Sequence, residues 1–282
     1  MKKSIKVVLI GIGQMGQNHL RILSILKKID IVFISDFSQK VSKKFSDLYG
    51  VKYKKIDQIN SYDYKDVDGI IICTPTSTHL NYIKIFAPLV KNIFVEKPIA
   101  NTLEETYEVQ KIINKYKNNL QVGFIERFNP AVRSLKSILK KNKKVINIDF
   151  TRTNKVSSRI NDSDVVSDLM IHDLDLAIYI NGPVKNVYAQ GYAKENMIDF
   201  ASAILKHKDG AQSRVLASRI TNKKLRLIEV TCEDKFIDCD LLKKEMLIHR
   251  QAPLKVDKNQ NYIINEVNEI VNLQSQEALL IE

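Results

Sequence analysis

Three side chains in this sequence have the types and spacing needed to move a proton to and from an alcohol. Lys97 follows an apolar run at residues 93–95, and Asp168 lies four residues before His172 in a helical pattern. An imidazole can accept a hydroxyl proton, a carboxylate can orient the ring, and an ammonium can stabilise charge on the oxygen. The candidate catalytic residues are therefore Lys97, Asp168 and His172.

Each of these features has a simpler interpretation when it is taken alone. A Lys-Pro pair at a strand end is commonly a surface turn, and an Asp–His pair at positions i and i+4 is commonly an exposed helix contact. The catalytic interpretation gains weight because one chain carries both features beside a nucleotide-binding motif. The bond between Lys97 and Pro98 is also a candidate cis peptide.

A glycine fingerprint near the start of the chain predicts a dinucleotide site. It follows an apolar run and opens a helical pattern, which is the context that the motif requires. Its first glycine permits a tight turn, the second lets the backbone approach a pyrophosphate, and the third lets the helix pack close to the strand. The predicted cofactor residues of this loop are Gly11, Ile12, Gly13, Gln14, Met15 and Gly16.

Asp36 stands at the end of the next apolar run, about 20 residues after the fingerprint, where a carboxylate binds ribose hydroxyls. Its charge would repel a 2′-phosphate, so NAD is favoured over NADP as the cofactor. Three lysines just downstream, Lys40, Lys43 and Lys44, keep NADP open as the less favoured alternative.

A hydroxyl-rich loop follows the apolar run that ends at residue 73. Open α/β sheets hold ligands at the carboxyl ends of their strands, so this loop is a second candidate cofactor contact. The alternative is an ordinary helix cap, and one loop can serve both purposes. The predicted contacts here are Thr74, Pro75, Thr76 and His79, joined by Glu96 and Lys97 after the following strand.

The first part of the chain alternates apolar runs with helical stretches. Strands are predicted at residues 5–10, 31–35, 51–53, 69–73, 92–95 and 120–123, with helices at 14–28, 38–49, 79–90 and 102–117. Nearly all-apolar strands separated by helices indicate a parallel sheet covered on both faces. The fold class predicted for residues 1–123 is a doubly wound α/β domain of the Rossmann type, which would bind the dinucleotide.

The pattern changes in residues 124–282. Helices are predicted at 128–140 and 163–180, followed by strands at 184–193, 197–206, 212–221, 225–232, 236–242 and 246–250, after one at 145–152. Strands in succession without helices between them indicate an antiparallel sheet, so this part is expected to be an α+β domain that binds substrate and mediates dimerisation. A further helix is expected at residues 261–273.

Composition narrows the functional classes. The 282 residues are 44% hydrophobic and carry a formal charge of +12, from 44 Lys and Arg against 32 Asp and Glu. The basic residues are scattered without a nucleic-acid motif, so we expect a lysine-rich surface, with an anionic substrate as the alternative and no nucleic-acid or membrane partner. Three cysteines without paired spacing and no signal peptide indicate a reducing cytoplasm, and no metal site is expected.

Two polar residues just past the last predicted parallel strand are candidate substrate contacts. Arg127 and Asn129 could meet sugar or phosphate groups, beside Lys97 and His172. The alternative is a surface ion pair for the arginine and helix capping for the asparagine.

Taken together, these motifs resemble the Gfo/Idh/MocA family of oxidoreductases. The resemblance rests on the glycine fingerprint, Glu96-Lys97-Pro98, the Asp168/His172 pair, the Thr74-Pro75-Thr76 loop with His79, and residues 123–130, and it covers about residues 5–250. It implies an N-terminal Rossmann domain, a C-terminal domain with an open, mostly antiparallel sheet, and a cofactor in the crevice between them. Members of the family often pair through that sheet, which implies a homodimer or homotetramer.

Residues 126–132 and 168–173 further resemble the subgroup of UDP-N-acetylglucosamine 3-dehydrogenases. The resemblance implies an NAD-dependent dehydrogenase that oxidises a secondary hydroxyl of a sugar or nucleotide sugar. The alternatives are a free polyol or inositol dehydrogenase, an NAD-dependent glycosidase of the same family, and a non-catalytic NAD-binding regulator.

Overall fold

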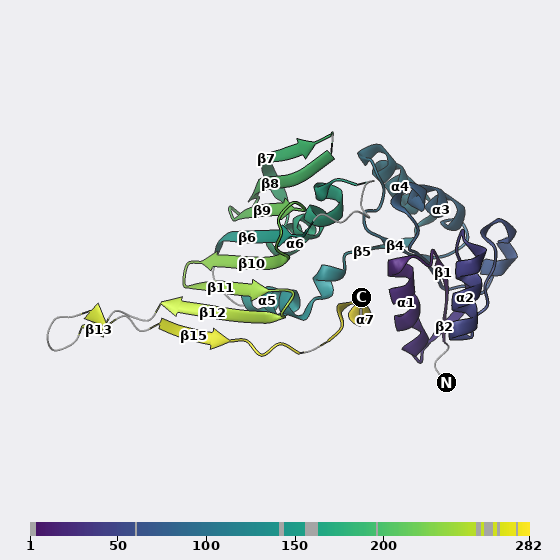
Figure 1. The fold of residues 1–282 in the computed structure, drawn as a ribbon, viewed down its shortest axis with the longest axis horizontal. Coiled ribbons are helices and arrows are strands. Elements are labelled where there is room, and N and C mark those ends of the chain that lie inside the picture. Colours follow the sequence, from purple (N-terminus) through teal and green to yellow (C-terminus); the bar gives the residue numbers. More distant parts are fainter. Residues whose placement is uncertain are drawn as a thin grey trace. The chain divides into compact units, whose positions relative to one another are not determined.

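The computed structural model describes residues 4–282 except 60, 141–143, 156–162, 196, 252–254, 257–261, 264–265 and 275. The chain divides into two compact units, residues 1–124 with residue 282, and residues 125–281 (Figure 1). Each unit has its own sheet. No helix in the described part of the chain is long and apolar enough to cross a bilayer.

The first unit is built on a five-stranded sheet in which all neighbouring strands are parallel. The strand order is β2-β1-β3-β4-β5. The strands span Ile5–Ile10 (β1), Ile29–Ser35 (β2), Gly69–Ile72 (β3), Asn92–Glu96 (β4) and Asn119–Gly123 (β5). The order reverses between β1 and β3, and this reversal is the point at which doubly wound sheets bind ligands.

Helices cover both faces of this sheet, as its continuous apolar strands require. They span Gln14–Ile25 (α1), Gln39–Tyr49 (α2), His79–Phe86 (α3) and Leu103–Tyr116 (α4). In β1, Leu9 packs with Leu20 of α1 on one face, while Val8 and Ile10 pack with Ile83 of α3 on the other. The Rossmann prediction is confirmed, but the strand expected at residues 51–53 is reduced to a single bridge between Tyr53 and Ile34.

The second unit carries an eight-stranded sheet in the order β15-β12-β11-β10-β6-β9-β8-β7. Only β6 and β9 pair in parallel, so the predicted mostly antiparallel sheet is confirmed. The strands span Val145–Thr153 (β6), Val184–Lys194 (β7), Met197–His207 (β8), Gln212–Ser218 (β9), Leu225–Cys232 (β10), Lys235–Asp240 (β11), Glu245–Gln251 (β12) and Glu266–Ile270 (β15). A separate two-stranded sheet joins Lys255–Val256 (β13) to Tyr262–Ile263 (β14).

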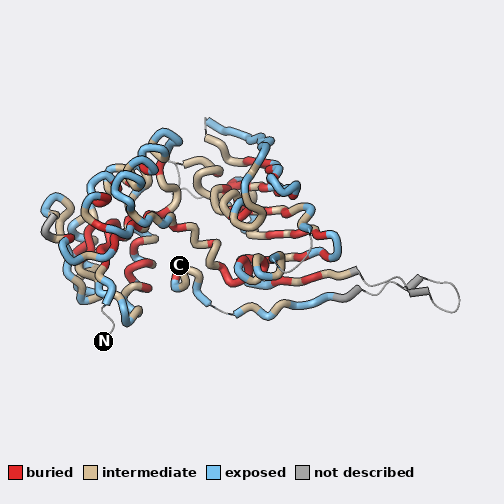
Figure 2. The backbone as a smooth tube through the Cα atoms, turned by 180° about the vertical axis from the view of Figure 1, so that it is seen from behind, coloured by how far each residue is buried: buried red, intermediate tan, exposed pale blue. Residues whose placement is uncertain are grey.

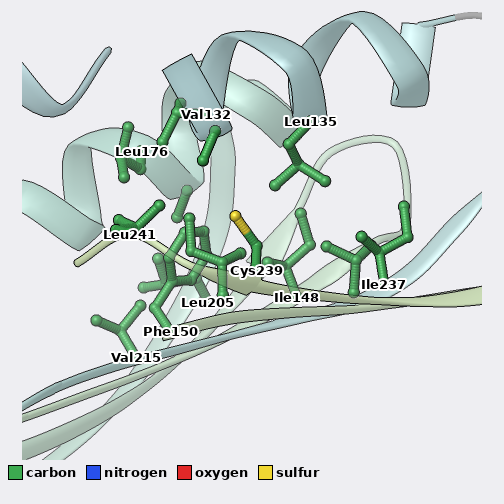
Figure 3. Packing of buried hydrophobic residues seen from close by; sticks show 14 of the residues in the cluster. Val132, Leu135, Ile148, Phe150, Leu176, Leu205, Val215, Ile237, Cys239 and Leu241 are labelled. Atoms are coloured by element: carbon green, nitrogen blue, oxygen red, sulfur yellow. The ribbon is translucent and has the colours of Figure 1, made fainter. Parts of the chain in front are cut away.

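Helices α5 (Pro130–Lys140) and α6 (Ile171–Asn181) contribute to the hydrophobic core on one face of this sheet. Val132 and Leu135 of α5 and Leu176 of α6 pack over Ile148 and Phe150 of β6 (Figure 3). Along the chain, burial is concentrated in the central strands, whereas β7 is exposed over almost its whole length (Figure 2). A short helix, α7 (Ala278–Ile281), comes after β15 in the chain.

The helix expected at residues 261–273 is wrong for the part that the structure describes. Residues Glu266–Ile270 form β15, which pairs antiparallel with β12 and becomes the edge strand of the sheet. Pairing with β12 determines the secondary structure of this segment. The edge of β12 offers backbone hydrogen-bonding groups that only an extended segment can use.

Candidate dinucleotide and proton-transfer sites

The glycine loop between β1 and α1 has no room for side chains at two of its three glycines. Gly11 has φ +90°, and a Cβ added there would come within 2.6 Å of the backbone of Cys73, at the end of β3. A Cβ on Gly16 would lie 1.9 Å from the carbonyl oxygen of Gly11. These contacts bring the loop, the helix and the end of β3 together at the reversal of the strand order, as a dinucleotide seat requires.

Asp36 is fixed in place by two backbone amides. Its Oδ2 accepts a hydrogen bond from the N–H of Ile12 at 2.7 Å, and its Oδ1 accepts one from the N–H of Ser38 at 2.8 Å. The carboxylate therefore stands directly beside the glycine loop. A carboxylate in this place fits the ribose of a dinucleotide and opposes a 2′-phosphate.

A cavity of about 700 Å³ lies over these elements in the first unit. Its volume is within the range of small-molecule sites. Its lining includes the predicted Gly11, Gly13, Met15, Asp36, Thr74, Pro75, Glu96 and Lys97, together with Ile10, Phe37, Cys73, Thr78 and Tyr82. The residues present fit a dinucleotide, because glycines, a fixed carboxylate and hydroxyls line one hollow. Ile12, Gln14, Gly16, Thr76 and His79 are not among its lining residues.

Phe37 and Tyr82 also line this cavity, although the sequence motifs do not include them. Phe37 directly follows Asp36, the predicted ribose carboxylate, and is 95% exposed. Its place next to that carboxylate is the sequence signal that could have identified it. Tyr82 lies three residues after His79, so it falls on the same face of α3, which sequence spacing could also have shown.

The loop after β3 forms a 3₁₀ helix at Thr76–Thr78 before α3 begins at His79. The Thr78 hydroxyl lies 2.7 Å from the Thr74 hydroxyl and 2.7 Å from the Pro75 carbonyl oxygen. His79 is only 1% exposed, and both ring nitrogens lie 2.9 Å from backbone carbonyl oxygens, of Pro98 and of Thr74. Its part in the site is therefore to connect loops within the domain.

Lys97 stands at the end of β4 and lines the cavity, and the Lys97–Pro98 bond is cis, as the sequence suggested. Glu96 is buried and lies 2.8 Å from the Nε2 atom of His19. These two residues and Cys73 are the only group in the described part of the chain whose side chains could ligate a metal together. His19 and Glu96 bond each other directly, and burial together with Glu96 raises the pKa of the Cys73 thiol.

In the second unit, Asp168 and His172 occupy a distorted helix. Residues Val166–Met170 form a π-helical turn, which passes into α6 at Ile171. Because four residues complete about one turn in either helix type, the two side chains share a face as predicted. Single π-turns occur frequently at functional sites, and this turn contains Asp168 and adjoins the helix that carries His172, the two members of the predicted proton-transfer pair.

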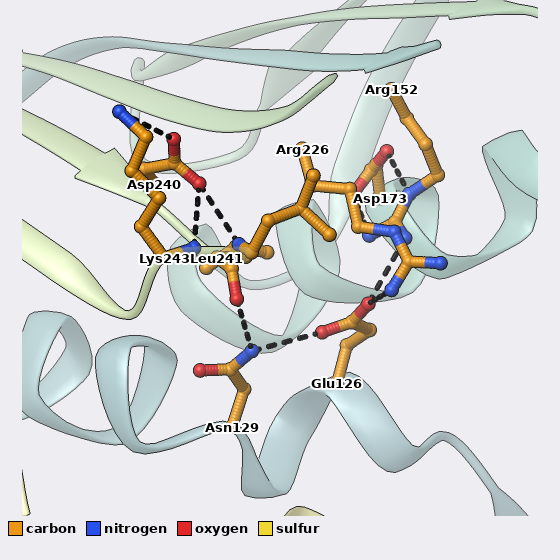
Figure 4. A network of polar contacts seen from close by, with 9 residues as sticks. Glu126, Asn129, Arg152, Asp173, Arg226, Asp240, Leu241 and Lys243 are labelled. Atoms are coloured by element: carbon orange, nitrogen blue, oxygen red, sulfur yellow. Dashed lines mark hydrogen bonds and ion pairs between the residues drawn. The ribbon is translucent and has the colours of Figure 1, made fainter. Parts of the chain in front are cut away.

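The residue after His172 anchors this helix to the sheet. Asp173 receives two hydrogen bonds at 2.8 Å from the guanidinium of Arg152, which is 2% exposed (Figure 4). Glu126 accepts hydrogen bonds from Arg152 at 3.0 Å and from Arg226 at 3.2 Å. The Asp173 carboxylate is therefore used inside the domain, where it fixes α6 to the sheet.

The charges of this network balance each other. Arg152 and Arg226 are directly opposite on β6 and β10, an arrangement that is unfavourable unless anions lie between them. Burial opposes the charge of Arg152, but Asp173 and Glu126 raise its pKa. Burial also opposes ionisation of Glu126, yet Arg152 and Arg226 lower its pKa. For Asp173, burial outweighs Arg152 and raises the pKa.

The two predicted substrate contacts have different surroundings. Arg127 forms a two-pronged ion pair with Asp175, and its side chain remains 39% exposed. Asn129 is buried, its amide nitrogen donates to Glu126 and to the Leu241 carbonyl, and its oxygen accepts from the N–H of Ala131. These bonds favour the helix-capping interpretation of Asn129.

Comparison with known proteins agrees with both units. The family profile described as "Oxidoreductase family, NAD-binding Rossmann fold" matches residues 5–124, and the profile "GFO/IDH/MocA C-terminal domain" matches residues 144–238. The uncharacterized oxidoreductase YrbE of Bacillus subtilis is 32% identical over 241 residues, which cover 78% of this chain and 68% of that protein.

Two further relatives have named activities. UDP-N-acetylglucosamine 3-dehydrogenase of Acidithiobacillus ferrooxidans is 26% identical over 97% of this chain and 84% of that protein, and inositol 2-dehydrogenase of Rhizobium meliloti is 27% identical over 77% of this chain and 69% of that protein. The solved structure of the first enzyme superimposes with a TM-score of 0.85 at 23% identity, covering 99% of this chain and 86% of that one. The chain belongs to the Gfo/Idh/MocA family of oxidoreductases, with an NAD-binding Rossmann domain at its N-terminus.

Proposed function

We propose that this chain is an NAD-dependent dehydrogenase that oxidises a secondary hydroxyl of a nucleotide sugar, with C3 of UDP-N-acetylglucosamine as the first candidate. One observation carries the choice of substrate. The similarity to UDP-N-acetylglucosamine 3-dehydrogenase extends over 97% of the chain, whereas that to inositol 2-dehydrogenase extends over 77%. The longer match covers nearly the whole chain, and so nearly the whole of the second unit, where a substrate domain would differ between enzymes.

In this proposal His172 is the general base that accepts the proton of the sugar hydroxyl. Asp168, on the same helix face, orients the ring and stabilises its protonated form. Lys97 donates a hydrogen bond to the same oxygen and stabilises the negative charge that develops there. The nicotinamide, when bound, supplies the acceptor for the hydride, so the residues of this chain contribute position and electrostatics.

The proposal includes NAD in preference to NADP. Asp36 supports this preference. Hydrogen bonds from two backbone N–H groups hold its carboxylate beside the glycine loop, where its negative charge would repel a 2′-phosphate on the ribose. Like charges forced together at a binding site cost several kcal/mol. The lysines downstream, which would favour NADP, lie beyond this carboxylate in the sequence.

Arg127 is the proposed contact for the anionic part of the substrate. Its guanidinium is partly exposed while Asp175 holds it in place, and a guanidinium is suited to planar, two-pronged recognition of phosphate. The net charge of +12 would favour the approach of a diphosphate. Asn129 is left out of the proposed substrate contacts because its amide is engaged within the domain.

A substrate panel tests this function. The purified chain is incubated with UDP-N-acetylglucosamine, other UDP-hexoses, the free sugars and myo-inositol, each with NAD and with NADP, and reduced cofactor is followed by absorbance. We expect formation of NADH with UDP-N-acetylglucosamine and a 3-keto product in mass spectrometry. Turnover of myo-inositol alone would favour the polyol enzyme, and a hydrolysed sugar without net NADH would favour the glycosidase. NADH binding without any turnover would favour the regulator.

The proposal extends to self-association through the face of the second unit's sheet that lies away from α5 and α6. Tyr188, Tyr192 and Ile204 are exposed on this face, with Ile270 at its other edge. Large exposed apolar side chains on one face commonly mark an interaction surface. Light scattering should give the mass of a dimer or tetramer, with dissociation when Tyr188 and Ile204 are both replaced by Lys. A monomeric mass for the unaltered chain would contradict this assembly.

A further inference from the structure

Two buried histidines lie on either side of the turn that carries Lys97. His19 is 8% exposed and belongs to α1, while His79 is 1% exposed and begins α3. Neither is among the residues that line the cavity. They therefore require an explanation other than contact with a ligand.

His19 is bonded to the residue before the lysine. Its Nε2 lies 2.8 Å from Oε1 of Glu96, and Oε2 of Glu96 accepts a hydrogen bond from the N–H of Lys97 at 3.3 Å. The ring of Phe94 meets the His19 ring edge-on, with centroids 5.0 Å apart. A Cβ at Gly123 would lie 3.1 Å from Oε2, so the neighbouring strand leaves space for this carboxylate. The glycine-loop helix is thereby connected to the backbone of Lys97.

His79 is bonded to the residue after the lysine. Its Nδ1 lies 2.9 Å from the carbonyl oxygen of Pro98, and its Nε2 lies 2.9 Å from the carbonyl oxygen of Thr74. Because Thr74 lines the cavity, this ring connects the second cofactor loop to the turn after β4. The lysine is thus held from both sides by groups whose other attachments belong to the dinucleotide seat.

We propose that His19 and His79 are positioning residues that fix Lys97 relative to the dinucleotide seat. The inference rests on the proposed function in so far as Lys97 is the group that acts on the substrate oxygen. A displacement of about 1 Å of a reacting group can cost about a hundredfold in rate. The two histidines should therefore govern turnover more than cofactor affinity.

Matched amide variants can separate the individual bonds. The amide nitrogen of Asn falls near the place of Nδ1 of His, and that of Gln falls near the place of Nε2, so each amide can replace one ring donor. At position 79 the bond to the lysine turn uses Nδ1, so His79→Asn keeps it and His79→Gln loses it. At position 19 the bond uses Nε2, so His19→Gln keeps it and His19→Asn loses it.

We expect His79→Gln and His19→Asn to lower kcat by about 10- to 100-fold, with the dissociation constant for NADH near that of the unaltered chain. His79→Asn and His19→Gln should keep most of the turnover. The matched control is His207 in the second unit, which is also 1% exposed and uses both ring nitrogens, toward the Gly182 carbonyl and the Ser213 hydroxyl. His207→Asn and His207→Gln should lower the melting temperature without a selective loss of kcat.

A second readout does not depend on turnover. The rate at which trinitrobenzenesulfonate labels the Lys97 amine, measured by peptide mass spectrometry, should change in His79→Gln and His19→Asn by more than the spread among the other lysines. It should stay near the original rate in His79→Asn and His19→Gln. This pattern without turnover of any substrate would support the positioning role and reject the proposed function. Equal effects in all four variants, or no effect in any, would overturn the positioning role.

Discussion

Replacing His172 by Ala should lower kcat by about two to four orders of magnitude, the usual contribution of a positioned general base. Replacing Lys97 by Met should have an effect of similar size, because Met keeps the length of the side chain but removes the donor that stabilises the oxygen. NADH affinity should remain close to the original value for His172→Ala, since this residue belongs to the second unit. Turnover of the best substrate in the panel and NADH fluorescence titration measure the two quantities.

The controls for this experiment come from residues of the same type outside the proposed site. His249 on β12 bonds Asp238 and Asn268, and Lys84 on α3 pairs with Glu108. His249→Ala and Lys84→Met should keep kcat within about twofold, because surface pairs contribute about 0–1 kcal/mol and neither residue belongs to the proposed site. Unchanged turnover in both His172→Ala and Lys97→Met would refute the catalytic assignment. Loss of turnover in only one of these variants would reject the catalytic role of the residue replaced in the other.

The second large effect concerns stability. Arg152→Ala should lower the free energy of unfolding by about 3–5 kcal/mol, because it removes the partner of the buried Asp173 carboxylate and leaves Glu126 with Arg226 alone. Asp173 and Glu126 are only 2% and 6% exposed, and both would lose their ion pair with Arg152. Urea denaturation followed by circular dichroism measures the shift in the transition of the second unit.

Arg214 provides the matched control for Arg152. It lies on β9, in the same sheet, and pairs with Asp149 at 2.8 Å, but its side chain is 60% exposed. Arg214→Ala should change the free energy of unfolding by less than about 1 kcal/mol. Equal effects of the two substitutions would mean that the buried network does not stabilise the domain, and that α6 is held by its apolar contacts alone.

Local patterns in the sequence predicted the candidate dinucleotide seat. Gly11, Gly16 and Asp36 are recognisable as candidates because a tight turn, a closely packed helix and a carboxylate at the ribose each demand a residue type at a nearly fixed spacing. The alternation of apolar strands with helices likewise determined the parallel sheet, since such strands must be covered on both faces. These features depend on neighbours that are close in the chain, so the sequence carries them directly.

Tertiary structure alone decided which polar residues are used inside the fold. The bond between His19 and Glu96 joins residues 77 positions apart, and the pairing of Arg152 with Asp173 joins residues 21 positions apart on different elements. No periodicity encodes such pairs, because burial and direction are set only when the strands and helices have packed. The edge strand β15 arose in the same way, from the free backbone groups of β12. The sequence thus determined which candidate site residues this chain carries, and packing determined which other residues hold those side chains in place.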